Sequence, residues 1–417
     1  MRVVCIGDIG VTDDIVHIGD EAMFHEMTQQ LRRRGVQEIV AISSNPKESS
    51  ARYGVTGIHR VGYFTDAARS RSVAEDRMSR VLRTAAGEKN LLEADDTALT
   101  IIAAIEHCDA VAIAGGGNLA STWPTHIFER ATIGALARHF DKPLVISGQT
   151  IGPFLTEPDA ALVAELLGSA QLVGLREGDS YALSQRLGVD PALLNQTIDD
   201  ASFLAIDGAD AIDGSDADDR APYCVVTMAA YINNEDPHLF DQRMAELLDD
   251  VVTRCDLDIM FFAHFGSTRP DAAVGDTVVH DRIKARMTST RVSTCATTDS
   301  PAAARLARGA ALSVSSRYHP AVFAVSAGVP SVGIAVDDYT TTKLTGALGN
   351  FGQDGVLPLA AVLAGTGTEI ICRVWSTRVL EDEDRAATIR RNRAASELWW
   401  NRVAAALSRA TPDPFGS

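Results

Sequence analysis

The sequence predicts an α/β protein made of two Rossmann-like domains that face each other across a cleft. Its length of 417 residues is too great for one ordinary hydrophobic core. Short apolar runs alternate with segments of helical periodicity, which is typical of parallel sheets covered on both faces. An acidic, turn-rich stretch at 207–222 interrupts this alternation, which then starts again. The chain therefore reads as two α/β domains joined by a linker.

The alternation begins at the first residues, where the apolar run "VVCI" predicts a buried strand. In the helical segment that follows, Met23, Met27 and Leu31 recur every four residues and so mark one helix face. In the first domain we expect strands at 3–6, 38–42, 110–114, 143–148 and 171–175, and helices at 20–35 and 90–108. In the second we expect strands at 223–228, 258–265, 291–294, 311–316 and 331–336, and helices near 237–254 and 276–288.

A last amphipathic helix, at about 378–408, is long enough to return to the first domain. Its Trp399 and Trp400 would either pack on that domain or meet a membrane or a partner. Four parts are therefore expected: an N-terminal α/β domain (1–206), an acidic linker (207–222), a C-terminal α/β domain (223–376) and a helix packing back on the N-terminal domain (377–410).

Composition excludes several classes of function. The formal net charge of −17 disfavours nucleic-acid binding, which needs a basic face. The six cysteines are far apart and form no CxxC pair, so we expect reduced thiols and no metal site. No apolar run approaches 18 residues, and the chain opens directly on a strand, so we expect a cytoplasmic protein without a transmembrane segment. Contact with the inner face of a membrane and assembly into homo-oligomers stay open.

Glycines and amides follow two strands of the first domain. Gly115, Gly116 and Gly117 come after the strand at 110–114, with Asn118 next. Consecutive glycines leave backbone N–H groups open to a ligand, but the same residues also suit a tight turn. Gln149, after the strand that ends at 148, could bond ligand hydroxyls. These residues are candidates for a sugar- or anion-binding loop.

Charged residues mark two other strand ends of the first domain. Asp20 stands where a helix N-cap is expected, with Glu21 in the first turn; a simple capped helix explains both equally well. Arg176 follows the strand at 171–175 and opens a helix. It would either bind an anion or pair with nearby carboxylates.

The segment "SSRYHP" is the most informative part of the second domain. Arg317 and His319 stand where a buried strand meets an apolar helix, a place where a charge is costly unless an anion compensates it. Arginine suits bidentate binding of carboxylate or phosphate, and histidine can move a proton near neutral pH. Lys343, one of the few lysines, follows on the next loop. A satisfied structural pair is the alternative.

Taken in order, these motifs resemble those of the polysaccharide pyruvyl transferase family. The matching pieces are "HIGDEAM" (17–23), "AGGGNL" (114–119), "GQTIGPF" (148–154), "GLREGDS" (174–180) and "SSRYHPAVFAVSAGVP" (315–330), followed by Lys343. The resemblance implies a fold of the glycosyltransferase-B type and a role in polysaccharide or cell-wall biosynthesis. It also implies transfer of pyruvate from phosphoenolpyruvate, a co-substrate, onto two sugar hydroxyls, without any other cofactor.

The resemblance further implies that the N-terminal domain is the acceptor side and the C-terminal domain the phosphoenolpyruvate side, and it implies roles for the candidate residues. Arg317 and His319 would be catalytic, and Arg176, Arg317, His319 and Lys343 would bind the donor. The acceptor, a saccharide that is free or linked to a lipid or nucleotide, would be bound by Asp20, Glu21, Gly115, Gly116, Gly117, Asn118 and Gln149.

Two departures from the family pattern concern the acceptor. The first loop, "GDIGVTDDIVHIGDEAM", is longer than the family's short form, and "DDYTTTKL" replaces a simpler Tyr-Asp-x-Lys pattern. The alternative reading is a glycosyltransferase or epimerase of the same architecture that uses a nucleotide-sugar, because a diphosphate also attracts arginine and a glycine loop. A non-catalytic, anion-binding regulatory protein is a third reading, but it gives no reason for a histidine beside the arginine.

Overall fold

The structure is a computed structural model that describes residues 1–66, 70–206, 221–269, 271–377 and 382–408. Most of the linker expected at 207–222 lies outside these described residues. The chain divides into two compact units. Unit 1 contains Met1–Val11, Met23–Asp200 and the chain from Ala395, whereas unit 2 contains Thr12–Ala22 and Ala201–Ala394. The segment 12–22 is thus grouped with the C-terminal half of the chain.

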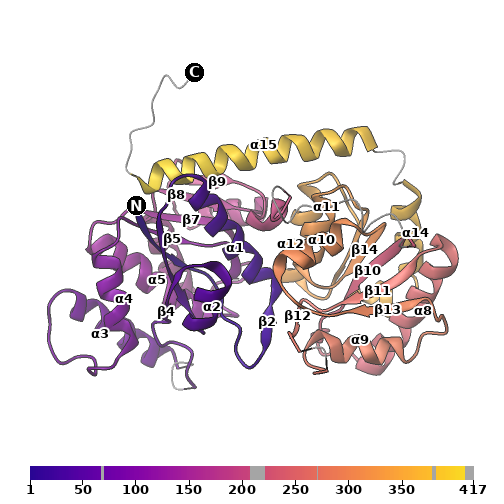
Figure 1. The fold of residues 1–417 in the computed structure, drawn as a ribbon, viewed down its shortest axis with the longest axis horizontal. Helices are drawn as coiled ribbons and strands as arrows, with labels where there is room; N and C mark the ends of the chain where they lie inside the picture. Colours follow the sequence, from indigo (N-terminus) through magenta and orange to yellow (C-terminus); the bar gives the residue numbers. More distant parts are fainter. Residues whose placement is uncertain (67–69, 207–220, 270, 378–381, 409–417) are drawn as a thin grey trace. The chain divides into compact units, whose positions relative to one another are not determined.

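Unit 1 is built on an eight-stranded sheet in which every pairing is parallel (Figure 1). The strand order is β4-β3-β1-β5-β7-β8-β9, and β6 pairs with β7 beyond the end of β5. The strands are β1 (Arg2–Ile6), β3 (Glu38–Ser43), β4 (Thr56–His59), β5 (Ala110–Ile113), β6 (Gly116–Leu119), β7 (Leu144–Ile151), β8 (Leu172–Leu175) and β9 (Leu194–Gln196).

Alternate residues of these strands enter two different cores. Val4 and Ile6 lie in a core with residues of α3 (Arg71–Ala85), α4 (Thr97–Glu106), α5 (Pro124–His139) and α6 (Glu157–Gly168). Val3 and Cys5 lie in the other core, with residues of α1 (Ile18–Arg33), α2 (Pro46–Tyr53) and α15 (Asp382–Leu407). Because both faces of the sheet are buried, its strands read as continuous apolar runs.

The end of α15 covers part of the second face of this sheet. Trp399 and Trp400 are buried in the same core as Val3. The indole N–H of Trp399 donates to the Ser147 hydroxyl at 2.9 Å, and its ring lies against Gly174, where a side chain would collide with it. Both tryptophans thus pack inside unit 1.

Unit 2 contains a six-stranded sheet that is also entirely parallel, in the order β13-β11-β10-β14-β15-β16. Its strands are β10 (Tyr223–Thr227), β11 (Asp258–Phe262), β13 (Val292–Cys295), β14 (Leu312–Ser315), β15 (Ser331–Ala335) and β16 (Val356–Pro358). Its helices are α8 (Pro237–Cys255), α9 (Asp276–Lys284), α10 (Ser300–Arg308), α11 (Tyr318–Val325), α12 (Asp338–Gly349), α13 (Leu359–Leu363) and α14 (Gly367–Thr377). The predicted α/β class with two parallel sheets is confirmed.

The extra part of the long first loop forms a strand of its own. β2 (Ile15–His17) pairs antiparallel with β12 (Phe265–Ser267), and both belong to unit 2. The Ile18 N–H then donates to the His264 carbonyl, so the start of α1 is tied to the end of β11. The insertion that departs from the family pattern is therefore an ordered element of unit 2.

Several predicted boundaries are corrected by local contacts. The predicted helix at 90–108 begins only at Thr97, because the Asp96 carboxylate accepts the Ala98 N–H and caps it there. The predicted strand at 143–148 continues to Ile151 as β7, with a register shift between Ile146 and Gln149. Gly148, in the left-handed region at φ +51°, accommodates this shift.

Candidate functional site

The seam between β14 and α11 in unit 2 is a tight, hydrogen-bonded corner. Ser315 is the last residue of β14, and its hydroxyl accepts the Arg317 N–H and donates to the Arg317 carbonyl, both at 2.9 Å. Arg317 is the N-cap residue of α11, which begins at Tyr318. Parallel strands bring their carboxyl ends to one edge of the sheet, where open α/β sheets bind ligands. The fold therefore places Arg317 and His319 at that edge.

Asp276, which the sequence analysis did not single out, fixes the guanidinium of Arg317. Nε of Arg317 lies 3.2 Å from both carboxylate oxygens of Asp276, and Nη2 lies 2.6 Å from Oδ1. The Asp276 carboxylate is fully buried and also accepts the N–H groups of His264 and Phe265. No described residue accepts a hydrogen bond from Nη1 of Arg317, whose side chain is 31% exposed. One edge of the fork is held by the protein, and the other is available to an anion.

His319 lies in the first turn of α11 and is packed against the first turn of α1. A Cβ added to Gly19 would collide with Nδ1, Cε1 and Cγ of the His319 ring, so only glycine fits at position 19. On other sides the ring lies near Tyr318, with centroids 5.0 Å apart, and Phe323, at 6.0 Å. The imidazole is buried and held by close packing.

Two further buried histidines surround this corner, and both are neutral. Burial, together with the nearby His319 and Arg317, holds the pKa of His264 well below its ordinary value. Burial and the charge of Arg317 lower the pKa of His280 to about 3. Nε2 of His280 accepts the Met228 N–H at 2.9 Å, which leaves the ring proton on Nδ1. These two histidines therefore add no positive charge near the seam.

Lys343 lies in helix α12 rather than on a loop, as the sequence had suggested. The helix begins early because the Asp337 carboxylate accepts the Thr340 N–H, while the Thr340 hydroxyl accepts the Asp337 N–H. The Lys343 ammonium lies 4.8 Å from the ring centroid of Tyr318 and 4.7 Å from that of Tyr339. Because Tyr318 is the first residue of α11, the Lys343 ammonium lies close to the seam.

Asp20 and Glu21 belong to the first turn of α1, in unit 2. The helix begins at Ile18, so Asp20 is its third residue and not the N-cap that the sequence suggested. Glu21 is buried, and Asp20 lies 4.0 Å from Nδ1 of His17. The structure thus groups these carboxylates with His319, whereas the glycine segment lies in unit 1.

The glycine segment of unit 1 is largely a strand, not the loop that three glycines suggested. Gly116 pairs with Gln149 in the parallel β6–β7 register, and α5 begins only at Pro124. The side-chain oxygens of Asn118 and Gln149 are buried and accept no hydrogen bond from any described residue. Both lie near the position where a Gly116 Cβ would stand, at 3.2 Å and 3.5 Å. Two hydrogen-bond acceptor oxygens therefore lie close to the backbone of Gly116.

Arg176, expected to bind the donor, lies in a buried ion-pair cluster of unit 1. Its side chain is 0% exposed, with Nη1 2.5 Å from the Asp199 carboxylate and Nε 3.1 Å from the Glu177 carboxylate. Nε also donates to the Thr150 hydroxyl. Two carboxylates from its own unit thus compensate its charge.

Asp200, which the sequence analysis missed, lies against the same glycine segment. Its Oδ1 accepts the Ser147 hydroxyl at 2.8 Å, and a Cβ on Gly148 would collide with the carboxyl group. Burial raises the pKa of Asp200 to about 8, and the charge of Asp199 acts in the same direction against the Ser147 hydrogen bond. Asp200 therefore holds its proton more tightly than an ordinary aspartic acid does.

The order and chemistry of these residues agree with one family. The sequence model of the polysaccharide pyruvyl transferase family matches residues 17–338, more than half of the chain. The chain belongs to this family. The match includes the corner with Arg317 and His319, as well as the glycine segment of unit 1. No curated protein sequence matches the chain.

Solved structures with a similar fold include UDP-N-acetylglucosamine 2-epimerases. The putative UDP-N-acetylglucosamine 2-epimerase from Listeria monocytogenes has a TM-score of 0.62 and 14% identity, covering 99% of this chain and 98% of that one. The UDP-GlcNAc 2-epimerase from Neisseria meningitidis, bound to UDP-GlcNAc, has a TM-score of 0.60 and 11% identity, covering 98% and 100%. At such identities the likeness concerns the fold alone, and it supports two Rossmann-like domains of the glycosyltransferase-B type.

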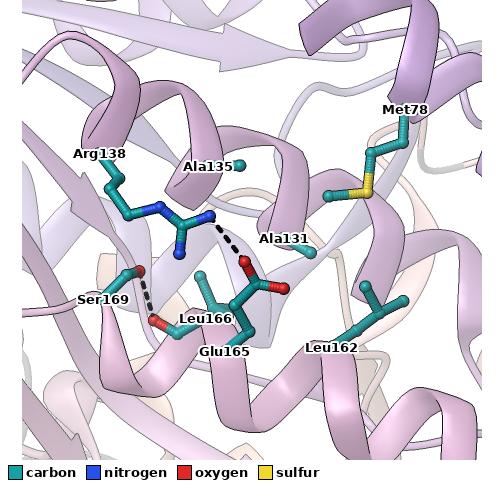
Figure 2. Close-up of a pocket in the computed structure, with 8 residues that line it drawn as sticks. All are labelled: Met78, Ala131, Ala135, Arg138, Leu162, Glu165, Leu166 and Ser169. Atoms are coloured by element: carbon teal, nitrogen blue, oxygen red, sulfur yellow. Dashed lines mark hydrogen bonds and ion pairs between the residues drawn. The ribbon is translucent and has the colours of Figure 1, made fainter.

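A small hollow in unit 1 lies apart from all candidate residues. Figure 2 shows it between α3, α5 and α6, with Met78 and Leu162 on its apolar side. The Arg138 guanidinium and the Glu165 carboxylate, 2.6 Å apart, pair with each other across it. These helices cover a face of the sheet and do not follow its strand ends, so we assign this hollow no role in binding.

Among the described helices, none combines the length and apolarity needed to cross a membrane.

Proposed function

We propose that this polysaccharide pyruvyl transferase moves the pyruvate unit of phosphoenolpyruvate onto two hydroxyls of a saccharide, forming a cyclic ketal and releasing phosphate. The observation that carries the proposal is the corner of unit 2. There Arg317 is held by Asp276 with one nitrogen left for a ligand, and His319 lies two residues further on, in the first turn of α11. Phosphoenolpyruvate carries a phosphate and a carboxylate, which are the anions that such a guanidinium binds best.

The reaction balances without a metal or a redox step. A proton adds to C3 of the enol, one sugar hydroxyl adds to C2, the C2–O bond to phosphate breaks, and the second hydroxyl closes the ring. The two hydroxyls together lose two protons, of which one corresponds to the proton gained at C3 and the other to the proton gained by phosphate. A positioned acid or base contributes about 10²–10⁴-fold to such steps. We assign this proton transfer to His319, at C3 or at the departing phosphate.

The phosphate and the carboxylate of the donor each need a cationic partner. Arg317 and Lys343 would bind its two anionic groups, and the helix dipole of α11 adds positive potential at the same place. His264 and His280 stay neutral, so they do not compete for the anion. Arg176 also stands in the donor set that the family resemblance implies. Its buried pairing with Asp199 makes a structural role the competing explanation, which a variant can separate.

The acceptor-binding set that the family resemblance implies has members in each unit. The converging oxygens of Asn118 and Gln149 need hydrogen-bond donors, which sugar hydroxyls supply. Gly115, Gly116 and Gly117 would belong to the acceptor site as the family resemblance implies, and of the three Gly117 is the partly exposed one. Asp20 and Glu21 lie on the same helical turn as Gly19, whose backbone contacts His319, so a carboxylate there could accept a proton from a hydroxyl of the acceptor.

A second candidate function is catalysis on a nucleotide-sugar, because UDP-GlcNAc 2-epimerases share the fold. Thermal unfolding of the full chain separates the two, with phosphoenolpyruvate, UDP, GDP and CDP compared at equal concentration. A ligand at about 100 times its Kd stabilises by about 2.7 kcal/mol, which raises Tm by several degrees. We expect a shift with phosphoenolpyruvate that Arg317→Ala abolishes. A shift with UDP and none with phosphoenolpyruvate would favour the nucleotide-sugar function.

A further inference from the structure

Exposed aromatic side chains gather at one edge of unit 1. Among the described residues, the exposed large aromatic side chains are Phe64, Trp123, Phe154 and Tyr231. The first three lie in unit 1 and are 43%, 45% and 64% exposed. Each follows the carboxyl end of a parallel strand, respectively β4, β6 and β7. An exposed aromatic ring does not contribute to the hydrophobic core. A group of such rings on one edge therefore indicates a surface that a ligand covers.

These aromatic residues are neighbours in space. The Ser121 N–H donates to the Phe154 carbonyl at 3.0 Å, which joins the loop before Trp123 to the loop after β7. The His126 ring packs edge-on against Phe64, with centroids 4.8 Å apart, and against Trp123, at 6.3 Å. We call Phe64, Trp123, His126 and Phe154 the aromatic rim.

A polar cluster lies directly beside the aromatic rim. Nε2 of His126 is 3.0 Å from one oxygen of Asp8, and the Arg60 guanidinium is 2.6 Å from the other. Arg60 also pairs with Glu129 and covers the face of the Phe64 ring at 3.7 Å. Nδ1 of His126 is buried and has no hydrogen-bond partner among the described residues. The cluster thus combines rings with a partly exposed carboxylate.

The charges of this cluster indicate an uncharged ligand. Arg60 and Arg130 balance Asp8 and Glu129, so the formal charges of the four groups cancel. The hydrogen bond with His126 and the charge of Arg60 outweigh burial and hold the pKa of Asp8 well below its ordinary value. An ionised carboxylate accepts hydrogen bonds from hydroxyls but repels phosphates and carboxylates.

We propose that the aromatic rim and Asp8 bind a neutral sugar ring of the acceptor. A pyranose offers an apolar C–H face that stacks on Trp123 or Phe154, and hydroxyls that donate to Asp8. The chain runs directly from Asn118 in β6 to Trp123 and from Gln149 in β7 to Phe154. The rim therefore continues the acceptor groups of unit 1 outward from the strands. This inference deepens the proposed function and rests on it for its place in the reaction.

The test measures binding of neutral disaccharides to the full chain by saturation-transfer difference NMR. The probes are cellobiose, lactose, mannobiose and chitobiose, with glucuronic acid as the anionic comparison. Trp123→Ala and Phe154→Ala remove exposed rings, and Leu398→Ala removes a side chain of α15 that is also exposed. We expect at least one disaccharide to bind, with Kd raised at least about fivefold by each aromatic variant, as for loss of one stacked ring. Leu398→Ala should leave Kd unchanged.

The outcomes separate this inference from the proposed function. Binding that survives both aromatic variants, stronger binding of glucuronic acid, or absence of binding by all four disaccharides would overturn the sugar-binding rim. The same variants are also heated with phosphoenolpyruvate. If Trp123→Ala keeps the wild-type shift in Tm, the donor site stands whatever the fate of the rim. If wild type shows no shift but Trp123-dependent sugar binding persists, the proposed donor fails and the rim remains.

Discussion

Arg176 and Arg317 occupy equivalent places in the two units and differ in what surrounds them. Each follows a buried parallel strand, β8 or β14, and precedes a helix, α7 (Gly178–Arg186) or α11. Arg176 is 0% exposed and pairs with two carboxylates. Arg317 is 31% exposed and pairs, among the described residues, with Asp276 alone, through Nε and Nη2. The same strand–arginine–helix pattern thus builds an internal cluster in one unit and an open fork in the other.

The largest expected effect concerns His319, which lies beside the open fork of Arg317 in unit 2. His319→Ala should lower turnover by about 10²–10⁴-fold, the usual contribution of a positioned acid or base, and should leave Tm near that of wild type. Release of phosphate from phosphoenolpyruvate in the presence of acceptor measures it. His107→Ala, an exposed histidine of unit 1, is the matched control. An unchanged rate in His319→Ala would remove this residue from the mechanism.

The closed side of the comparison predicts a loss of stability. Arg176→Ala leaves Asp199 and Glu177 buried without their cation, and breaking a buried pair in this way costs about 3–5 kcal/mol. Urea denaturation followed by circular dichroism measures the free energy of unfolding. A variant as stable as wild type would show that the cluster does not need its arginine.

Gly19→Ala tests whether packing around the open corner positions His319. The added methyl group would displace the imidazole, and a displacement of about 1 Å at a reacting group can cost about 10²-fold in rate. Gly349→Ala is the control, because nothing lies within 4 Å of the position of its Cβ. Equal activity of the two variants would contradict a positioning role for Gly19.

A pH-dependent effect concerns Asp200, which adjoins the closed cluster. Its pKa is raised from an ordinary 3.8 to about 8 in the folded chain, so the unfolded chain loses this proton first as pH rises. Stability present at low pH is therefore lost between about pH 4 and 8, by at most about 1.4 kcal/mol per pH unit. Asp200→Asn should flatten this dependence of Tm on pH. An identical pH profile in both proteins would show that Asp200 is ionised when folded.

The sequence predicted those features that depend on neighbours along the chain. Apolar runs located most strands of both sheets but missed the short strands β4, β6, β9 and β16. The segment "SSRYHP" placed Arg317 and His319 at a seam between a strand and a helix. The capping pair Asp337 and Thr340 is also a local pattern, and it puts Lys343 in a helix, whereas a loop was predicted there.

Contacts between distant residues could not be predicted in this way. Asp276 lies 41 residues before its partner Arg317, and no local pattern marks it as that partner. Gly116 joins a strand because Gln149 pairs with it, although glycines by themselves suggest a turn. The aromatic rim likewise depends on the Ser121–Phe154 hydrogen bond, which joins separate loops.

The most direct test of the contrast between the two arginines is calorimetric titration of phosphoenolpyruvate into wild type, Arg317→Lys and Arg176→Lys. Lysine cannot both hold Asp276 and bind an anion, so we expect Arg317→Lys to weaken binding about tenfold or more, the value of one charge-assisted hydrogen bond. Arg176→Lys should lower Tm and leave the Kd unchanged. Wild-type affinity in Arg317→Lys, with affinity lost in a folded Arg176→Lys, would contradict the account and make Arg176 the donor ligand.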